Sequence, residues 1–314
     1  MAIVFTSVFP VFALILTGYI CARRHILGPA ASETLNLFVV WLALPALLFQ
    51  AMANISWDGF NHPGFLAAFT GGMMLTFLLS FLLGTRAHHR LADRSIEGLD
   101  AAYANTGFMG IPLCLAALGP GSLVPAIIAT ILTACVLFAA AIILIETDLA
   151  QTPQLSVTLG KVARSLARNP LLVAPVLGVA AAVLRAQTGL TLPAPVFRYT
   201  TLLGDAASPC ALVTIGLFLA QSEPANDKAL ITRLVGLKLL VQPALTYLIA
   251  FKLFSMPPIW SHSALILSAL PIGTGPFMLA KLYNREAAVT SRAILVSTVL
   301  SLITVSALVA WLAH

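Results

Sequence analysis

The sequence predicts an all-α integral membrane protein in which ten transmembrane helices form two inverted five-helix repeats, each with one interrupted helix. The composition, the placement of basic residues and the spacing of prolines lead to this prediction. Of the 314 residues, 60% are hydrophobic and 9% are charged, and the mean hydropathy is +0.98. A water-soluble domain of this composition would expose a very large apolar surface. We therefore expect lipid to surround most of the chain.

Ten apolar stretches approach the roughly 20 residues that a helix needs to cross the hydrocarbon core. The first, residues 2–20, lacks a preceding basic segment and an A-x-A cleavage site, and Arg23 and Arg24 follow it. We interpret it as a retained helix and not as a signal peptide. The predicted spans are residues 2–20, 35–52, 64–84, 99–118, 123–145, 171–184, 200–220, 230–254, 262–281 and 288–312.

Basic residues fall mainly in alternate connections between these spans. Of the 17 lysines and arginines, thirteen lie in or close to one set of connections, three lie in or close to the other set, and Lys238 lies deeper inside the eighth span. Cytoplasmic loops carry an excess of Lys and Arg, so the first set is expected in the cytoplasm. This orientation places both termini on the non-cytoplasmic side.

The longest polar stretch divides the chain into two halves of similar length. We predict a first five-helix repeat over residues 1–145, a cytoplasmic linker over residues 146–169 and a second repeat over residues 170–314. A repeat with an odd number of crossings ends on the opposite face from its start. The second repeat must therefore be inserted with inverted topology.

The spacing of prolines supports a duplication. Pro45 precedes Pro209 by 164 residues, and Pro112 precedes Pro276 by the same interval. The first pair falls on the second and seventh predicted helices, and the second pair falls on the fourth and ninth. These are equivalent helices of the two repeats, although 19 prolines also allow a chance coincidence.

Glycine and proline cluster in residues 105–112 and 271–276, and we expect each cluster to interrupt its helix. Unwound backbone at membrane depth is tolerated only where protein buries it or water reaches it. In inverted-repeat transporters such breaks meet near the midplane, where half-helix N-termini attract anions. The predicted substrate site comprises Asn105, Thr106, Gly107, Gly110, Pro112, Thr133, Gly273, Thr274, Gly275 and Pro276.

Several of these side chains also have a purely structural interpretation. Asn105 offers a donor and an acceptor to a carboxylate, or it forms a hydrogen bond between helices. Thr133 presents its hydroxyl to the same site, or it bonds to its own helix. Lys238 lies deep in its span, where an ammonium is expensive, and Gln242 follows one turn later. We predict a supporting or coupling role for both, with snorkelling of the lysine as the alternative.

Residues 104–113, Ala-Asn-Thr-Gly-Phe-Met-Gly-Ile-Pro-Leu, resemble the fourth-helix signature of the auxin efflux carrier family. Residues 269–283 resemble its ninth-helix counterpart, and residues 42–49, 203–209 and 296–301 also resemble family segments. The resemblance therefore covers essentially the whole chain.

The resemblance implies a scaffold domain of helices one, two, six and seven and a transport domain of helices three to five and eight to ten, which moves as an elevator. It places Asn105, Pro112 and Pro276 on family positions near the substrate. The long hydrophilic domain of many plant members is absent. A compact bacterial-type member of the plasma (inner) membrane is therefore expected, which carries a small carboxylate such as malonate, or an auxin-like acid.

Other functions have less support in the sequence. An enzyme is not expected, because the chain contains no H-E-x-x-H or G-x-S-x-G motif and no paired aspartates in its spans. The scattered basic residues argue against nucleic acid as a partner, and the scattered cysteines and histidines predict neither a metal nor a cofactor. A carrier of a cation or neutral solute, or a membrane protein without transport activity, remains an alternative. A coupling ion, H⁺ or Na⁺, and a homodimer are also left open.

Overall fold

The computed structural model describes residues 2–54, 62–84, 90–149, 160, 163–164, 167–189, 193–222, 225 and 227–312. In this part of the chain the regular elements are all helices. The β-type pairing described there is a single antiparallel bridge between Ala104 and Ile272. Eight helical segments are long and apolar enough to cross a membrane. Large apolar side chains on them are exposed, such as Leu82 at 67% and Ile303 at 70%. The chain is therefore an all-α membrane protein, as predicted.

These eight segments lie within a few residues of predicted spans at most of their ends. They are formed by α1 (Ala2–Arg23); α2 (Pro29–Phe38), η1 (Val39–Ala43) and α3 (Leu44–Ala53); α4 (Pro63–Leu83); η4 (Pro120–Ser122), α7 (Leu123–Leu132), η5 (Thr133–Leu137) and α8 (Phe138–Leu149); α10 (Pro170–Thr188); α11 (Ala194–Asp205) and α12 (Ala207–Ala220); α13 (Lys228–Gly236), η6 (Leu237–Val241), α14 (Gln242–Leu248) and η7 (Ile249–Leu253); and α17 (Ala288–Leu312).

The two remaining predicted spans, the fourth and the ninth, are each divided into shorter helices. The fourth consists of α5 (Leu91–Ala102), followed after three residues by η3 (Thr106–Gly110) and α6 (Ile111–Leu118). The ninth consists of α15 (Pro258–Ser268) and α16 (Gly275–Leu282). A helix of 12 residues is only about 18 Å long, so none of these pieces crosses the roughly 30 Å hydrocarbon core alone.

Three π-turns precede prolines: η1 and η6 lie inside continuous helical runs, and η3 begins the run that continues as α6. η1, η3 and η6 each end two residues before a proline, namely Pro45, Pro112 and Pro243. Proline lacks an amide hydrogen, and its ring clashes with the carbonyl four residues earlier. An extra residue in the preceding turn relieves this clash and lets the helix continue. Pro45 and Pro112 therefore do not break their helices.

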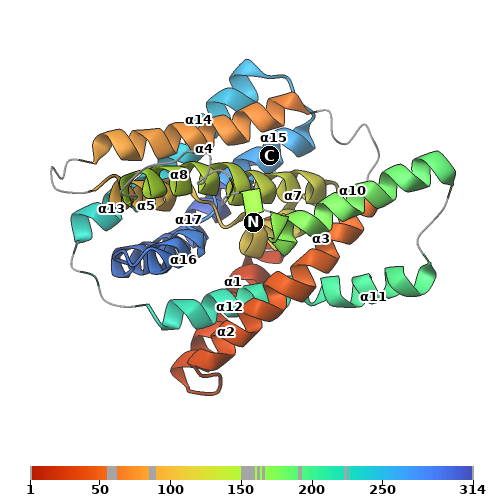
Figure 1. The fold of residues 1–314 in the computed structure, drawn as a ribbon, viewed down its shortest axis with the longest axis horizontal. Coiled ribbons are helices and arrows are strands. Elements are labelled where there is room, and N and C mark those ends of the chain that lie inside the picture. Colours follow the sequence, from red (N-terminus) through yellow and green to blue (C-terminus); the bar gives the residue numbers. More distant parts are fainter. Residues whose placement is uncertain are drawn as a thin grey trace.

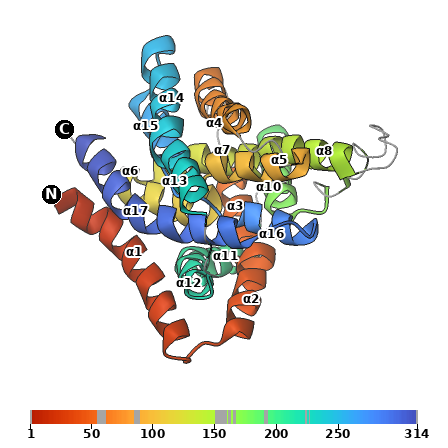
Figure 2. The ribbon, with the colours of Figure 1, turned by 90° about the vertical axis from the view of Figure 1, so that its left-hand side faces the viewer.

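The helices pack in two groups (Figures 1 and 2). In the first, α1 packs along α12, and α3 packs against α10 and α11. An added Cβ at Gly18 would lie 2.2 Å from the Val213 carbonyl oxygen, so the backbones of α1 and α12 are in close contact. In the second group, α4 packs against α5, α14 and α15, and α13 packs against α17. α1, α2 and α12 lie at one edge of the molecule, and α4, α14 and α15 lie at the opposite edge.

Two boundaries differ from prediction because charged residues fold into helices. α5 begins at Leu91 and not near residue 99, since Asp93, Arg94 and Glu97 all find polar partners within the fold. α8 continues to Leu149, so the first four residues of the predicted linker are helical. The linker residues 150–159, 161, 162, 165 and 166 lie outside the described part of the chain.

Candidate substrate site at the crossing of two interrupted helices

The first interruption separates α5 from η3. Tyr103, at the end of α5, has the extended conformation (φ −80°, ψ 93°), and Asn105 precedes η3. The Asn105 carbonyl accepts hydrogen bonds from the amides of Met109 (3.2 Å) and Gly110 (2.9 Å), which closes the π-turn. The break thus begins two residues before the predicted stretch, and Pro112 lies seven residues beyond Asn105 in the second half-helix.

The second interruption lies between Ser268, the last residue of α15, and Gly275, the first of α16. Pro271 lies in the middle of this connection, and Pro276 occupies the second position of α16. Proline is well accommodated in a first helical turn, because that turn has no intrahelical use for its amide. The interrupted residues, 269–274, overlap the predicted stretch 271–276, of which Gly275 and Pro276 already belong to α16.

The two interruptions cross and pair through their backbones. The Asn105 amide donates to the Pro271 carbonyl at 3.0 Å, and the Gly273 amide donates to the Tyr103 carbonyl at 3.0 Å. These bonds flank the antiparallel bridge between Ala104 and Ile272. The unwound segments therefore satisfy part of each other's hydrogen-bonding need, which is required of backbone buried at membrane depth.

One helical segment supplies caps for both half-helices that end at the crossing. On η6, Lys238 donates from Nζ to the carbonyl of Ser268, the last residue of α15, at 2.7 Å. At the start of α14, Gln242 donates from Nε2 to the carbonyl of Ala102, the last residue of α5, at 3.1 Å. Both side chains are fully buried. Each thus bonds a carbonyl at the partially negative C-terminal end of a helix.

The half-helices that begin at the crossing have no such caps. Neither Asn105, which precedes η3, nor Thr274, which precedes α16, forms a side-chain cap. Asn105 is 6% exposed, and its carboxamide forms no hydrogen bond with another described residue. The partially positive N-terminal ends of both half-helices and one amide side chain are therefore available at the crossing.

The glycines of the second break allow close packing against Tyr103 and Phe138, two aromatic residues that the sequence analysis does not single out. An added Cβ would lie 2.9 Å from the Tyr103 ring at Gly273, and 2.6 Å from Tyr103 and 2.7 Å from Phe138 at Gly275. The two rings pack edge to face at 5.0 Å. Tyr103 immediately precedes residues 104–113, which resemble the family signature. A bulky aromatic residue directly before a predicted interruption is the feature of the sequence that could have identified it.

The other predicted site residues lie around this centre at different places. Gly110 packs against Leu267 and Leu270 of the ninth span, with added-Cβ distances of 2.8 Å. Gly107 faces Thr130 of α7 at 3.5 Å. The Thr133 hydroxyl donates to the Ala129 carbonyl of its own helix at 2.8 Å. Of the two interpretations of Thr133, this bond fits the purely structural one. Pro112 and Thr106 lie on the helix that begins at the crossing.

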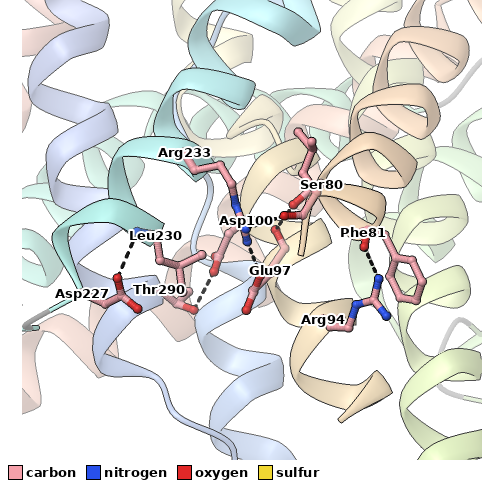
Figure 3. A network of polar contacts seen from close by, with 10 residues as sticks. Ser80, Phe81, Arg94, Glu97, Asp100, Asp227, Leu230, Arg233 and Thr290 are labelled. Atoms are coloured by element: carbon pink, nitrogen blue, oxygen red, sulfur yellow. Dashed lines mark hydrogen bonds and ion pairs between the residues drawn. The ribbon is translucent and has the colours of Figure 1, made fainter. Parts of the chain in front are cut away.

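A polar network surrounds α5 at Arg94, Glu97 and Asp100 (Figure 3). Arg233 of α13 pairs with Glu97 of α5 and also donates to the Leu83 carbonyl at the end of α4 at 2.9 Å. Asp100 accepts a hydrogen bond from Thr290 of α17 at 2.8 Å. Neither Asp100 nor any other described carboxylate forms an ion pair with Lys238. The network thus connects α4, α5, α13 and α17.

Two further contacts hold the end of α16 in place. Arg285 donates from Nε and Nη2 to the Asp93 carboxylate at 2.7 and 2.5 Å, and this hydrogen bonding raises the pKa of the Arg285 guanidinium. Tyr283 donates to Glu146 of α8 at 2.9 Å, and burial followed by the bond to Glu146 raises the pKa of the Tyr283 hydroxyl. These contacts connect the end of α16 with α5, through Asp93, and with α8, through Glu146.

The fold and this crossing define a polytopic membrane transport protein. Its half-helices meet inside the protein, and helix N-termini and an amide side chain converge where an ion or polar solute could be held. Among the described residues, no group of three or more His, Cys, Asp or Glu could hold a metal ion.

Comparison with known proteins identifies the family. Residues 3–309 match the model of the family described as "Membrane transport protein". The chain therefore belongs to this family, which is that of the auxin efflux carriers.

Relatives of the chain come from bacteria, archaea and plants. It is 33% identical over 303 residues, 96% of this chain and 93% of the relative, to a Rhizobium meliloti protein named "Putative malonate transporter". It is 27% identical over 95% of its length to an "Uncharacterized transporter" of Methanothermobacter thermautotrophicus, which it covers to 94%. It is 29% identical over 44% of its length to "Auxin efflux carrier component 3a" of Oryza sativa, of which the match spans only 23%.

Proposed function

We propose that this chain is a secondary transporter that moves a small organic anion across the bacterial plasma membrane by elevator-type alternating access. The crossing of the two interrupted helices carries the proposal. Its backbone bridge holds two helix N-termini and the unbonded carboxamide of Asn105 together at a buried position.

The electrostatics of the crossing favour an anion. The N-termini at Thr106 and Gly275 present partial positive charge, whereas the C-termini at Ala102 and Ser268 present partial negative charge. Lys238 and Gln242 donate to those two C-termini and so offset the repulsion that they would exert. Asn105 then adds hydrogen-bond donors for a carboxylate. The proposed substrate site includes Thr106, Gly273, Thr274 and Gly275 beside Asn105.

The proposed architecture has ten crossings, of which the two divided spans are the fourth and the ninth. The packing of α1, α3, α10, α11 and α12 supports a scaffold domain of helices one, two, six and seven. The contacts among α4, α5, α13, α14 and α17 support a separate transport domain. Two inverted repeats, residues 1–145 and 170–314, with both termini outside the cytoplasm, complete this proposal, and the scaffold is the surface that a homodimer would use.

A small dicarboxylate is the proposed substrate class. The relative named as a malonate transporter matches nearly the whole chain, whereas the plant carriers match 44% of it. We propose that coupling to H⁺ or Na⁺ acts at the crossing, where Lys238, among the described residues, is fully buried and contacts a helix end directly.

Uptake by sealed proteoliposomes that contain the purified chain tests this function. Malonate, indole-acetate and an amino acid are offered with imposed proton, sodium or no gradients. Saturable uptake of malonate is expected. The absence of saturable flux of any anion would contradict the proposal. Flux of the amino acid alone would show that the chain transports another class of substrate.

Asn105→Ala tests the site within the same assay. Loss of hydrogen bonds to a charged ligand is worth about 1.5–3 kcal/mol, so apparent affinity should fall by about tenfold to a hundredfold. The control is Asn54→Ala, which removes the same side chain at the end of α3, where it is exposed. Unchanged uptake by Asn105→Ala would remove this residue from the site.

A further inference from the structure

A long apolar groove runs between α1 and α17. It has a volume of about 1120 Å³ and is lined on the α1 side from Val8 to Ile20 and on the α17 side from Leu295 to Ser306. Its walls include strongly exposed side chains, such as Leu16 at 56% and Val299 at 61%. Both helices are long and apolar enough to cross a membrane, so the groove opens toward lipid.

The length of the groove corresponds to one leaflet. The rise along a helix from Val8 to Ile20 is about 18 Å, and half of the hydrocarbon core is about 15 Å thick. An acyl chain that lies along α1 would therefore extend from near the middle of the bilayer to the level of the headgroups.

A basic pocket begins where the apolar groove ends. The groove is lined by Tyr19 and Ile20 of α1 and by Leu219 of α12. The pocket, about 340 Å³, continues along both helices and is lined by Ala22, Arg23, His25, Leu27, Pro29, Ala220 and Gln221. Two separate helices thus pass from the apolar groove into the basic pocket within three residues.

The basic pocket has the chemistry of a phosphate site. Arg23 supplies a guanidinium that forms no ion pair with a described carboxylate, and His25 supplies an imidazole. α2 begins at Pro29 without a side-chain cap, so its partially positive end lies at the pocket. Two of the last carbonyls of α1 are already bonded, since Cys21 accepts from the amides of Ile26 and Leu27 and Ala22 accepts from that of His25. Their repulsion of an anion is correspondingly weak.

From this geometry we propose that the groove and the basic pocket together bind one anionic phospholipid. One acyl chain lies along α1 against α17, and the phosphate lies at Arg23 and His25. Basic pockets between transmembrane helices at headgroup level are suited to anionic lipids. In the proposed transport cycle this lipid would lie between a scaffold helix and a transport-domain helix, but its binding does not depend on that cycle.

Native mass spectrometry of the purified, delipidated chain tests the proposal. Phosphatidylglycerol and phosphatidylcholine with identical acyl chains are added in equal amounts, and the retained lipid is counted. The wild-type chain should retain phosphatidylglycerol in preference. Arg23→Gln should lower this preference about fivefold, the value of one basic residue near the headgroups, and Arg23→Lys should largely restore it.

Arg24→Gln is the matched control for charge, because Arg24 is the next residue and does not line the basic pocket. It should change the preference less than twofold. Equal effects of Arg23→Gln and Arg24→Gln would overturn the site, as would equal retention of both lipids by the wild-type chain. Thermal melting of Arg23→Gln shows whether the variant is folded. If it is not, the wild-type lipid preference and the Ala13→Phe variant still test the proposal.

Ala13→Phe tests the apolar groove, because it adds a ring to the groove wall. It should reduce retention of both lipids, whereas Ala180→Phe, at an exposed position of α10 outside the groove, should not. Unchanged lipid retention in Ala13→Phe would overturn the proposal. If that variant instead dissociates a dimer, the groove is a contact between two copies of the chain.

Discussion

At the scale of single residues, Lys238 shows how a buried charge can serve a site at a cost in stability. Its ammonium is fully buried and donates to the Ser268 carbonyl at 2.7 Å, and no described carboxylate pairs with it. A hydrogen bond to a charged group contributes about 1.5–3 kcal/mol, but removing an unpaired charge from water costs several kcal/mol. The second quantity is the larger. The lysine is therefore expected to be retained for function and not for folding.

Lys238→Met should accordingly unfold at the same temperature as the wild-type chain or higher, while malonate uptake falls. Methionine keeps most of the volume and removes the buried charge, but it leaves the C-terminal end of α15 without its donor. Thermal melting in detergent and uptake in proteoliposomes measure the two effects. Lys252→Met, at an exposed position of the same spanning segment, should change neither. A clearly lower melting temperature for Lys238→Met would show that the lysine stabilises the folded state.

At the scale of elements, the sequence predicts that two helices are interrupted, but not the position of every break. Pro276 lies at the start of α16, as its preference for a first turn indicates. Pro112 instead follows a π-turn inside a continuous run, and the break forms at residues 103–105. Its location depends on backbone pairing with Pro271 and Gly273, more than 160 residues away along the chain. No local propensity encodes such a contact.

Gly275→Ala tests the close packing at the second break. Its Cβ would lie within 2.7 Å of the Tyr103 and Phe138 rings, so the rings or α16 must shift, at a cost of about 1–3 kcal/mol. We expect a lower melting temperature and reduced uptake. The matched control is Gly236→Ala on α13, where an added Cβ meets nothing within 4 Å and should stabilise the helix by about 1 kcal/mol. Equal behaviour of the two variants would show that the break tolerates a side chain.

At the scale of the whole molecule, the packing of the helices into two groups has a mechanical consequence. The contact between α1 and α6, where Ser7 donates to the Ala116 carbonyl at 2.8 Å, connects a helix of the proposed scaffold with one of the proposed transport domain. The bond from Gln50 to Thr201 at 2.8 Å connects α3 and α11, both in the proposed scaffold. Elevator motion requires the first contact to change and the second to persist.

Cross-linking distinguishes these contacts in a chain whose four native cysteines are replaced. With cysteines at positions 7 and 116, a short bifunctional thiol reagent that is cleaved by reduction should stop uptake, and reduction should restore it. With cysteines at positions 50 and 201, the same reagent should leave uptake unchanged. If the first cross-link forms and transport continues, α1 and α6 do not move apart and the elevator proposal fails.

The sequence by itself determined the membrane environment, most of the helix ends and the presence of two interrupted helices. Hydropathy, proline and glycine act through a few neighbouring residues, and so they can be read locally. The tertiary structure decided which carbonyls Lys238 and Gln242 cap, that Ala104 pairs with Ile272, and that α5 includes its charged first turns. The contacts of Lys238, Gln242 and Ala104 join residues that are 30 to 168 positions apart, and Asp93 of α5 contacts Arg285, 192 positions away. Only the packed helices bring these partners within hydrogen-bonding distance.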